Sequence, residues 1–157
     1  MKQQNSGREK TTRVHYVLGT CALVLICAFL SGIACGQEAS EQSAEQLAKS
    51  WLVLVDAGNY TQSWNDVSEY LKKKITRSQW VAQLQQTRAP LGPVKSRRSA
   101  GTQFKSNLPG MPAGRYAAVQ YTTAFARLSS AKEVVALMLE NGHWRVVGYF
   151  DLGPHSK

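Results

Sequence analysis

The chain has 157 residues, 43% of them hydrophobic, and carries 19 Lys and Arg against 10 Asp and Glu, a formal net charge of +9. This length suggests one domain. All three cysteines lie in the first 35 residues. A domain built from residues 37–157 therefore has no thiol, which excludes a disulfide framework, a Cys-based metal site and a Cys nucleophile inside it.

The first 36 residues have the features of an export signal. Basic residues at positions 2, 8, 10 and 13 precede an uncharged, mostly apolar run over residues 17–34. Gly32, Ala34 and Gly36 give the small-x-small spacing that signal peptidase recognises. The run is at the lower limit for a membrane-spanning helix, so a cleaved signal, a lipoprotein and a retained signal anchor all stay open. A cleaved signal is the favoured interpretation, and we expect a periplasmic or secreted protein. The alternative is a protein anchored to the envelope by a lipid.

Cys35 is the lipidation candidate. Ile33-Ala34-Cys35-Gly36 resembles the end of a bacterial lipobox, and the polar residues 37–43 have the composition of a tether. Gly32, however, stands where that pattern usually has Leu. This difference favours the interpretation of Cys35 as a small apolar residue near a cleavage site.

The domain that remains is moderately basic. Residues 1–36 contain four basic and one acidic residue, and without them the net charge is +6. Such a charge fits nucleic acid, anionic lipid or mere solubility. Outside the cytoplasm we expect no nucleic acid, and we expect membrane contact only through the N-terminal segment. We expect residues 37–43 to be a polar linker, residues 44–152 one domain and residues 153–157 a tail.

Helical patterns fill the first half of this domain. Apolar residues recur at helical spacing over residues 44–57 and again over residues 60–74, and each stretch predicts one helix. Thr76 and Gln79 have the spacing of a capping box and predict the start of a third helix. Pro90 ends that helix, because the residue before a proline is driven out of helical geometry.

The second half of the domain has strand patterns. Two runs rich in β-branched and aromatic residues, within Glu133 to Phe150, flank Asn141-Gly142 and predict a hairpin with a type I′ turn. Lys95 to Ser106 and Tyr116 to Phe125 predict two further strands. Strands joined by short connections indicate an antiparallel meander. The predicted fold is α+β, with three N-terminal helices packed on a four-stranded antiparallel meander sheet.

Several ordered motifs resemble one bacterial family. They are W-L-V-L-V-D-A-G-N-Y at residues 51–60, R-A-P-L-G at 88–92, L-P-G-M-P-A-G-R-Y at 108–116 and G-H-W-R-V-V-G-Y at 142–149. The chain is similar, over about Leu47 to Phe150, to the uncharacterised exported family known as domain of unknown function 4019. The resemblance implies a small exported bacterial domain and no known catalytic residue. The order of helices and sheet also resembles cystatin-like and NTF2-like cone folds, by analogy alone.

Catalytic and metal-binding patterns are absent from the sequence. The domain has only His143 and, in the tail, His155, and no His, Asp and Glu cluster with metal-ligand spacing. No G-x-S-x-G elbow, P-loop or G-x-G-x-x-G motif occurs. We therefore expect no metal and no cofactor, and we assign no catalytic residue.

The aromatic residues allow two interpretations. Four tryptophans at helical and strand spacing are typical of a core between helices and sheet, which is the favoured one. The other is a pocket lined by rings with a few polar groups. Its candidate residues are Trp51, Asp56, Tyr60, Arg88, Tyr121 and Arg145. For Arg88 we favour a structural role, either capping helix carbonyls or pairing with Asp56.

Two functions remain open. The favoured one is a non-enzymatic exported envelope domain that binds a protein partner or a small apolar ligand through its sheet or cone. The alternative is an NTF2-like enzyme whose buried carboxylate, Asp56, works beside Tyr60 or Tyr121. The remaining acids are expected to be exposed to solvent: Asp66, Glu69, Glu133 and Glu140. Whether the chain is an enzyme is uncertain, and the balance leans against it.

The third predicted strand is apolar on both faces. Val134, Ala136 and Met138 alternate with Val135, Leu137 and Leu139. Because helices cover only one face of such a sheet, we expect the other to meet a homodimer partner or a ligand.

Overall fold

The computed structural model describes residue 41 and residues 43–152. The predictions for the leader, for Cys35 and for the tail 153–157 lie outside the described residues. The described residues belong to one compact unit of the chain. Among the described residues, no helix is both long enough and apolar enough to span a membrane.

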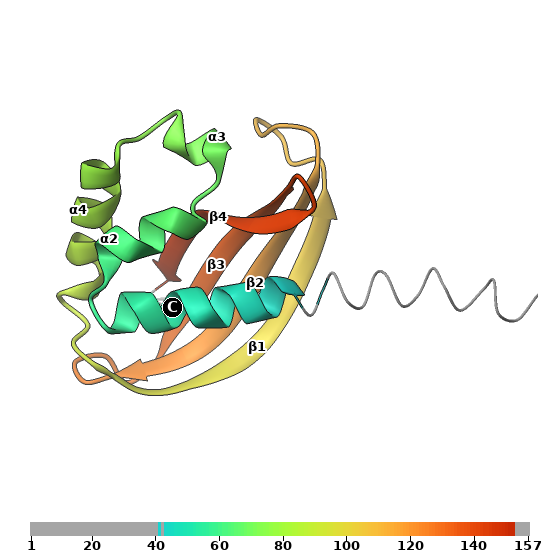
Figure 1. Ribbon diagram of the computed structural model, residues 1–157. Helices are drawn as coiled ribbons and strands as arrows, with labels where there is room; N and C mark the ends of the chain where they lie inside the picture. Colours follow the sequence, from blue (N-terminus) through green and yellow to red (C-terminus); the bar gives the residue numbers. More distant parts are fainter. Residues whose placement is uncertain (1–40, 42, 153–157) are drawn as a thin grey trace, which may run out of the picture. The chain divides into compact units, whose positions relative to one another are not determined.

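The first helix covers residues 43–56 and crosses the sheet (Figure 1). Gly58 ends it with a φ of 74°, a conformation that costs a residue without Cβ little. The backbone N–H of Gly58 donates to the carbonyl of Val55 and that of Asn59 to the carbonyl of Leu54, at 3.1 and 2.8 Å. These two bonds form a Schellman motif, which satisfies the last carbonyls of the helix.

The single helix predicted over residues 60–74 is wrong. The segment is divided into α2 (Tyr60–Ser63), the 3-10 turn η1 (Trp64–Asp66) and α3 (Glu69–Lys72). Val67 is extended, with a ψ of 141°, and forms a parallel bridge with Val146. The backbone N–H of Ser68 donates to the carbonyl of Val146 over 2.9 Å. Pairing with the free edge of the last strand thus holds Val67 in an extended conformation and interrupts the helix.

Helix α4 (Arg77–Arg88) begins as predicted. The Thr76 hydroxyl accepts from the backbone N–H of Gln79, and the Gln79 side chain accepts from the backbone N–H of Thr76, so the capping box is complete. Trp80 and Leu84 point into the core from this helix. Its last residue, Arg88, is buried as well.

The sheet is an antiparallel meander in the order β1-β2-β3-β4. Its strands are β1 (Val94–Ser106), β2 (Arg115–Phe125), β3 (Ala131–Glu140) and β4 (His143–Leu152). Asn141 and Gly142 join the last two strands with φ of 51° and 79°. Positive φ at both residues is the geometry of a type I′ turn. The expected α+β class and the four-stranded antiparallel sheet are confirmed.

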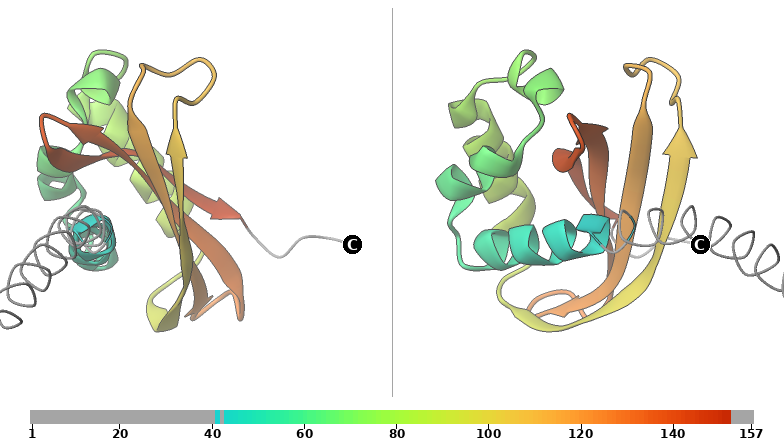
Figure 2. Two further views of the ribbon diagram at one scale, coloured as in Figure 1. Left: turned by 90° about the vertical axis from the view of Figure 1, so that its right-hand side faces the viewer. Right: turned by 45° about the vertical axis from the view of Figure 1, so that its right-hand side comes forward.

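Figure 2 shows the helices on one face of the sheet. We call this the inner face. Alternate residues of β2 and β3, including Ala117, Val119, Val135 and Leu137, pack there with the tryptophans of the helices. The intervening residues point to the opposite, outer face, because successive side chains of a strand alternate. Among the described residues, no helix covers the outer face (Figure 2).

Candidate functional site

Charged side chains meet at one end of the inner face, and Glu133 is at their centre. Glu133 is completely buried, so the expectation that it is exposed is wrong. The physical reason is its place on β3, because alternation puts it on the same face as Val135 and Leu137. A buried carboxylate needs partners to offset its lost hydration.

Arg88 brings the end of α4 to this carboxylate. Its Nη1 donates to Oε1 of Glu133 over 3.0 Å, and its Nη2 donates to Oδ1 of Asp56 over 2.7 Å. The guanidinium also stacks over the ring of Phe125, 4.7 Å from its centroid. The Arg88–Asp56 pair, one of the two structural roles considered for Arg88, is therefore present.

Arg97 of β1 joins the same two carboxylates from the other side. Its Nε donates to Oε2 of Glu133 over 2.7 Å, and its Nη1 donates to Oδ2 of Asp56 over 2.6 Å. Burial alone would lower the pKa of Arg97, but the hydrogen bonds to Asp56 and Glu133 outweigh it and raise the pKa. Arg97 is therefore cationic, and the cluster holds two cations and two anions.

Two hydroxyls complete the shell of Glu133. The Tyr149 hydroxyl donates to Oε1 over 2.5 Å, and the Thr123 hydroxyl donates to Oε2. Burial raises the pKa of Tyr149, and the negative charge of Glu133 raises it further. The phenol therefore keeps its proton and remains a donor. We call Asp56, Arg88, Arg97, Thr123, Glu133 and Tyr149 the ionic cluster.

The ionic cluster joins the first helix, α4 and all four strands, because each of these six elements supplies one member. Glu133 accepts bonds from both arginines and both hydroxyls, so its oxygens are occupied by donors. Asp56 is likewise held by two arginines. A general base must accept a proton from a substrate, and neither carboxylate is disposed to do so. The ionic cluster therefore holds these six elements together, and we call this role a structural lock.

The candidate pocket residues do not form one site. Asp56 and Arg88 belong to the ionic cluster, and Tyr121 lies beside it, with the Arg97 guanidinium 6.0 Å from its ring centroid. Trp51 is fully buried, and its indole N–H donates to the carbonyl of Ser63 over 3.2 Å.

Tyr60 and Arg145 lie apart from that group. Tyr60 packs against the core from α2 and lines a polar hollow, whereas Arg145 lies on β4 opposite Met138. All four tryptophans are buried, and Trp51 packs against Trp80 in a tilted arrangement with ring centroids 6.0 Å apart.

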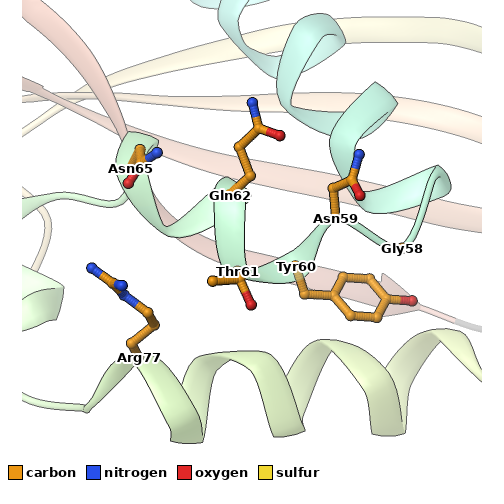
Figure 3. Close-up of a pocket in the computed structure, with 7 residues that line it drawn as sticks. All are labelled: Gly58, Asn59, Tyr60, Thr61, Gln62, Asn65 and Arg77. Atoms are coloured by element: carbon orange, nitrogen blue, oxygen red, sulfur yellow. The ribbon is translucent and has the colours of Figure 1, made fainter.

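That polar hollow, between the end of the first helix and α4, has a volume of about 410 Å³. Figure 3 shows Arg77 and the amide side chains of Asn59, Gln62 and Asn65 around it. The Asn59 and Gln62 side chains point away from Arg77 in this view, so the polar groups do not converge on one ligand position. We therefore do not take it as the site. Within the described part of the chain, no group of His, Cys, Asp and Glu residues is placed to hold a metal ion.

A groove on the outer face is the stronger candidate for binding. Its volume is about 420 Å³, within the range of small-ligand sites, and most of its lining is apolar. We call it the outer groove, and its lining includes Leu108, Met111, Tyr116, Ala118, Ala136 and Phe150. Phe150 is 52% exposed and Leu108 37%, a large exposure for apolar side chains that lie together.

Sequence reasoning found the apolar outer face of β3 but not the groove or its residues. The signal was the alternation that gives Ala136 and Met138 to the face without helices. The depth of the groove depends on which residues of neighbouring strands lie side by side, and that pairing is a property of the folded sheet.

The fold and these two features define a small α+β domain with a polar lock on one face of its sheet and an apolar groove on the other. The chain belongs to the family described as "Protein of unknown function (DUF4019)", whose model matches residues 47–149. No curated protein matches the chain. Among solved structures, it is similar to a candidate NTF2-like transpeptidase from Campylobacter jejuni, at 17% identity and a TM-score of 0.44, over 65% of this chain and 94% of the other. A likeness at this level transfers no activity.

Proposed function

We propose that this protein is an exported, non-enzymatic envelope domain that binds a small apolar ligand in the outer groove. The single observation that carries the proposal is the groove itself, an apolar hollow on the sheet face that lacks helices. Leaving Phe150 and Leu108 in water forgoes the free energy that burial of such side chains provides. Retained apolar surface of this kind marks a binding site for a ligand or partner.

The ionic cluster favours binding over the catalytic alternative. Catalysis by a carboxylate in an aromatic pocket requires a buried acid that faces a substrate. Asp56, the candidate base, is instead held by Arg88 and Arg97, and the fully buried acid Glu133 is saturated by donors. The charged groups of the inner face are thus engaged with one another, which leaves the outer groove as the better candidate for binding.

Photo-crosslinking tests the proposal in intact cells, with the full chain in its own compartment. The probe is a long-chain alcohol that carries a diazirine, and mass spectrometry locates the labelled residues. We expect labels on β2, β3 and β4 at outer-face positions such as Ala118 and Ala136. Ala136→Phe fills the groove and should abolish this labelling. Thr122→Phe adds the same ring to an exposed position of that face outside the groove and should not.

Labels spread evenly over the surface, or equal labelling of the Ala136→Phe protein, would refute ligand binding in the groove. Crosslinks from the groove to another protein, in place of the probe, would replace the ligand with a protein partner.

The envelope location rests on the pattern of the first 36 residues, a basic stretch followed by an apolar run and small residues. Fusion of a reporter enzyme that is active only after export tests it. We expect activity from a fusion after residue 152. Replacement of several apolar residues in the run 17–34 by charged ones should abolish that activity. Activity only from a cytoplasmic reporter would contradict the location.

A further inference from the structure

Small residues form a row across three strands of the outer face. The strand register places Ala118, Ala136 and Gly148 side by side from β2 to β4, and Gln103 of β1 lies beside Ala118 at the end of the row. The rows on either side contain larger residues, Val134 and Phe150 on one and Tyr116 and Met138 on the other. A row of small side chains between two rows of large ones makes a trough that crosses the strands, so its occupant must be long and narrow.

The Phe150 ring covers the β4 end of the trough. The Phe150 ring lies over Gly148, where a Cβ would be only 3.0 Å from two ring atoms. Beyond it, a second hollow of about 220 Å³ lies between α4 and β4. Val147 and Phe150 line both hollows, and Leu71, Ile75 and Leu84 supply apolar lining to the second. Val147 and Phe150 therefore lie between the two hollows, and an unbranched apolar chain in the first hollow ends against the Phe150 ring.

The opposite end of the trough is polar and positively charged. Gln103 and Lys105, on β1, line it there. The Lys105 ammonium has no hydrogen-bond or ion-pair partner among the residues that the structure describes. A cation at one end of an apolar trough complements an anionic head group on an apolar chain.

We infer that the outer groove binds a single-chain anionic amphiphile, a long-chain carboxylate, with its head group at Lys105 and its chain along Ala118 and Ala136 toward Phe150. This inference rests on the proposed function and adds the chemistry of the ligand. The narrow trough selects one chain over two. The charge of Lys105 selects an anion over an alcohol or an amine.

A pair of probes tests the inference in intact cells: a diazirine-bearing long-chain fatty acid and the alcohol of the same length. We expect the fatty acid to label Ala118, Ala136 and Phe150 more strongly than the alcohol does. Lys105→Glu should lower fatty-acid labelling about fivefold, the size of one ion pair at a solvent-accessible site. Lys132→Glu is the matched control, because Lys132 is an exposed lysine of the same face outside the groove, and it should leave labelling unchanged.

The outcomes separate the inference from the proposed function. Equal labelling by both probes that Lys105→Glu does not change would overturn the anionic head group and leave groove binding intact. Equal losses in the Lys105→Glu and Lys132→Glu proteins would point to the general charge of a membrane-facing surface and would also overturn the inference. If neither probe labels the groove and Phe150 is crosslinked to a second copy of the chain, the inference and the proposed function both fail.

Discussion

Arg88 and Glu133, 45 residues apart in sequence, are joined by a hydrogen bond of 3.0 Å in which the guanidinium and carboxylate are 6% and 0% exposed. This pair connects the end of α4 to the beginning of β3, one of the two inner strands of the sheet. Burial of two charges is costly, and the free energy is recovered only when every donor and acceptor has a partner. Arg97, Thr123 and Tyr149 supply those partners to Glu133.

Replacement of Glu133 should therefore destabilise the fold severely. Glu133→Gln keeps the shape of the side chain but leaves the buried Arg88 and the partly buried Arg97 without one of their anions, and we expect a loss of about 3–5 kcal/mol in the free energy of unfolding. Urea denaturation followed by circular dichroism measures it. Glu69→Gln removes an exposed carboxylate that pairs with Lys72 and should have a far smaller effect. Equal losses in both variants would show that the ionic cluster is not a lock.

Tyr149 should make the domain sensitive to alkali. Its raised pKa means that the folded state keeps a phenolic proton which the unfolded chain releases above about pH 10. The stability that Tyr149 contributes is therefore complete below about pH 10 and is lost as the pH rises toward the folded-state pKa.

Tyr149→Phe tests this dependence. Near neutral pH the variant should be less stable by about 1–2 kcal/mol, because a hydrogen bond to a buried carboxylate is lost. Above about pH 10 the gap between wild type and variant should narrow, because only the wild type has the Tyr149 proton to lose. Urea titrations across that range measure the gap. A gap that stays constant or widens above about pH 10 would contradict the prediction.

Asp151 lies next to the ionic cluster and lowers the stability of the fold. Its Oδ1 is buried without a hydrogen-bond partner among the described residues. Burial raises the pKa of Asp151, and the charge of Glu133 raises it further, although Arg88 opposes the shift. The charged form therefore destabilises the fold, and this penalty is present above the folded-state pKa and disappears as the pH falls through it.

Asp151→Asn should remove that penalty and stabilise the domain near neutral pH. Since the side chain is partly exposed, solvent screens the effect, and we expect a gain of about half a kcal/mol or less. As the pH falls, Asp151 of the wild type takes up a proton and its penalty disappears, whereas the asparagine of the variant does not titrate. The stability difference between variant and wild type should therefore shrink toward acidic pH. Thermal unfolding at neutral and acidic pH measures both quantities. Lower stability of the variant at neutral pH would mean that the charge of Asp151 is useful to the fold.

Local signals in the sequence predicted the local structure correctly. The Asn141-Gly142 hairpin and the capping box at Thr76 depend on residues within a few positions of one another, which a pattern can specify. The regular helical spacing of the sequence predicts a helix at Val67, yet this residue pairs with Val146 of an edge strand. A backbone partner 79 positions away has no local signature.

The ionic cluster was only partly accessible to sequence reasoning, for the same reason. The sequence indicates an Arg88–Asp56 pair, because both residues lie at the ends of predicted helices. Alternation along β3 explains why Glu133 is buried. The free-energy cost of burying this carboxylate, however, is offset by partners such as Arg97, 36 residues upstream. A carboxylate on a predicted strand is normally assigned to solvent. Only the folded domain brings two arginines to it, Arg88 from α4 and Arg97 from β1.

Phe150 should be needed for binding and dispensable for folding. The side chain is 52% exposed on the outer face, whereas Phe125 is 1% exposed on the inner face beneath Arg88. Phe125→Ala should cost about 3–5 kcal/mol of stability, as loss of a core ring does. Phe150→Ala should change stability by about 1 kcal/mol or less, yet it should sharply reduce crosslinking of the long-chain fatty acid, because the ring forms one wall of the trough. Urea denaturation and crosslinking of the same two variants measure both properties. A large loss of stability in Phe150→Ala would mean that the ring is retained for folding, and unchanged crosslinking would mean that it does not contact the ligand.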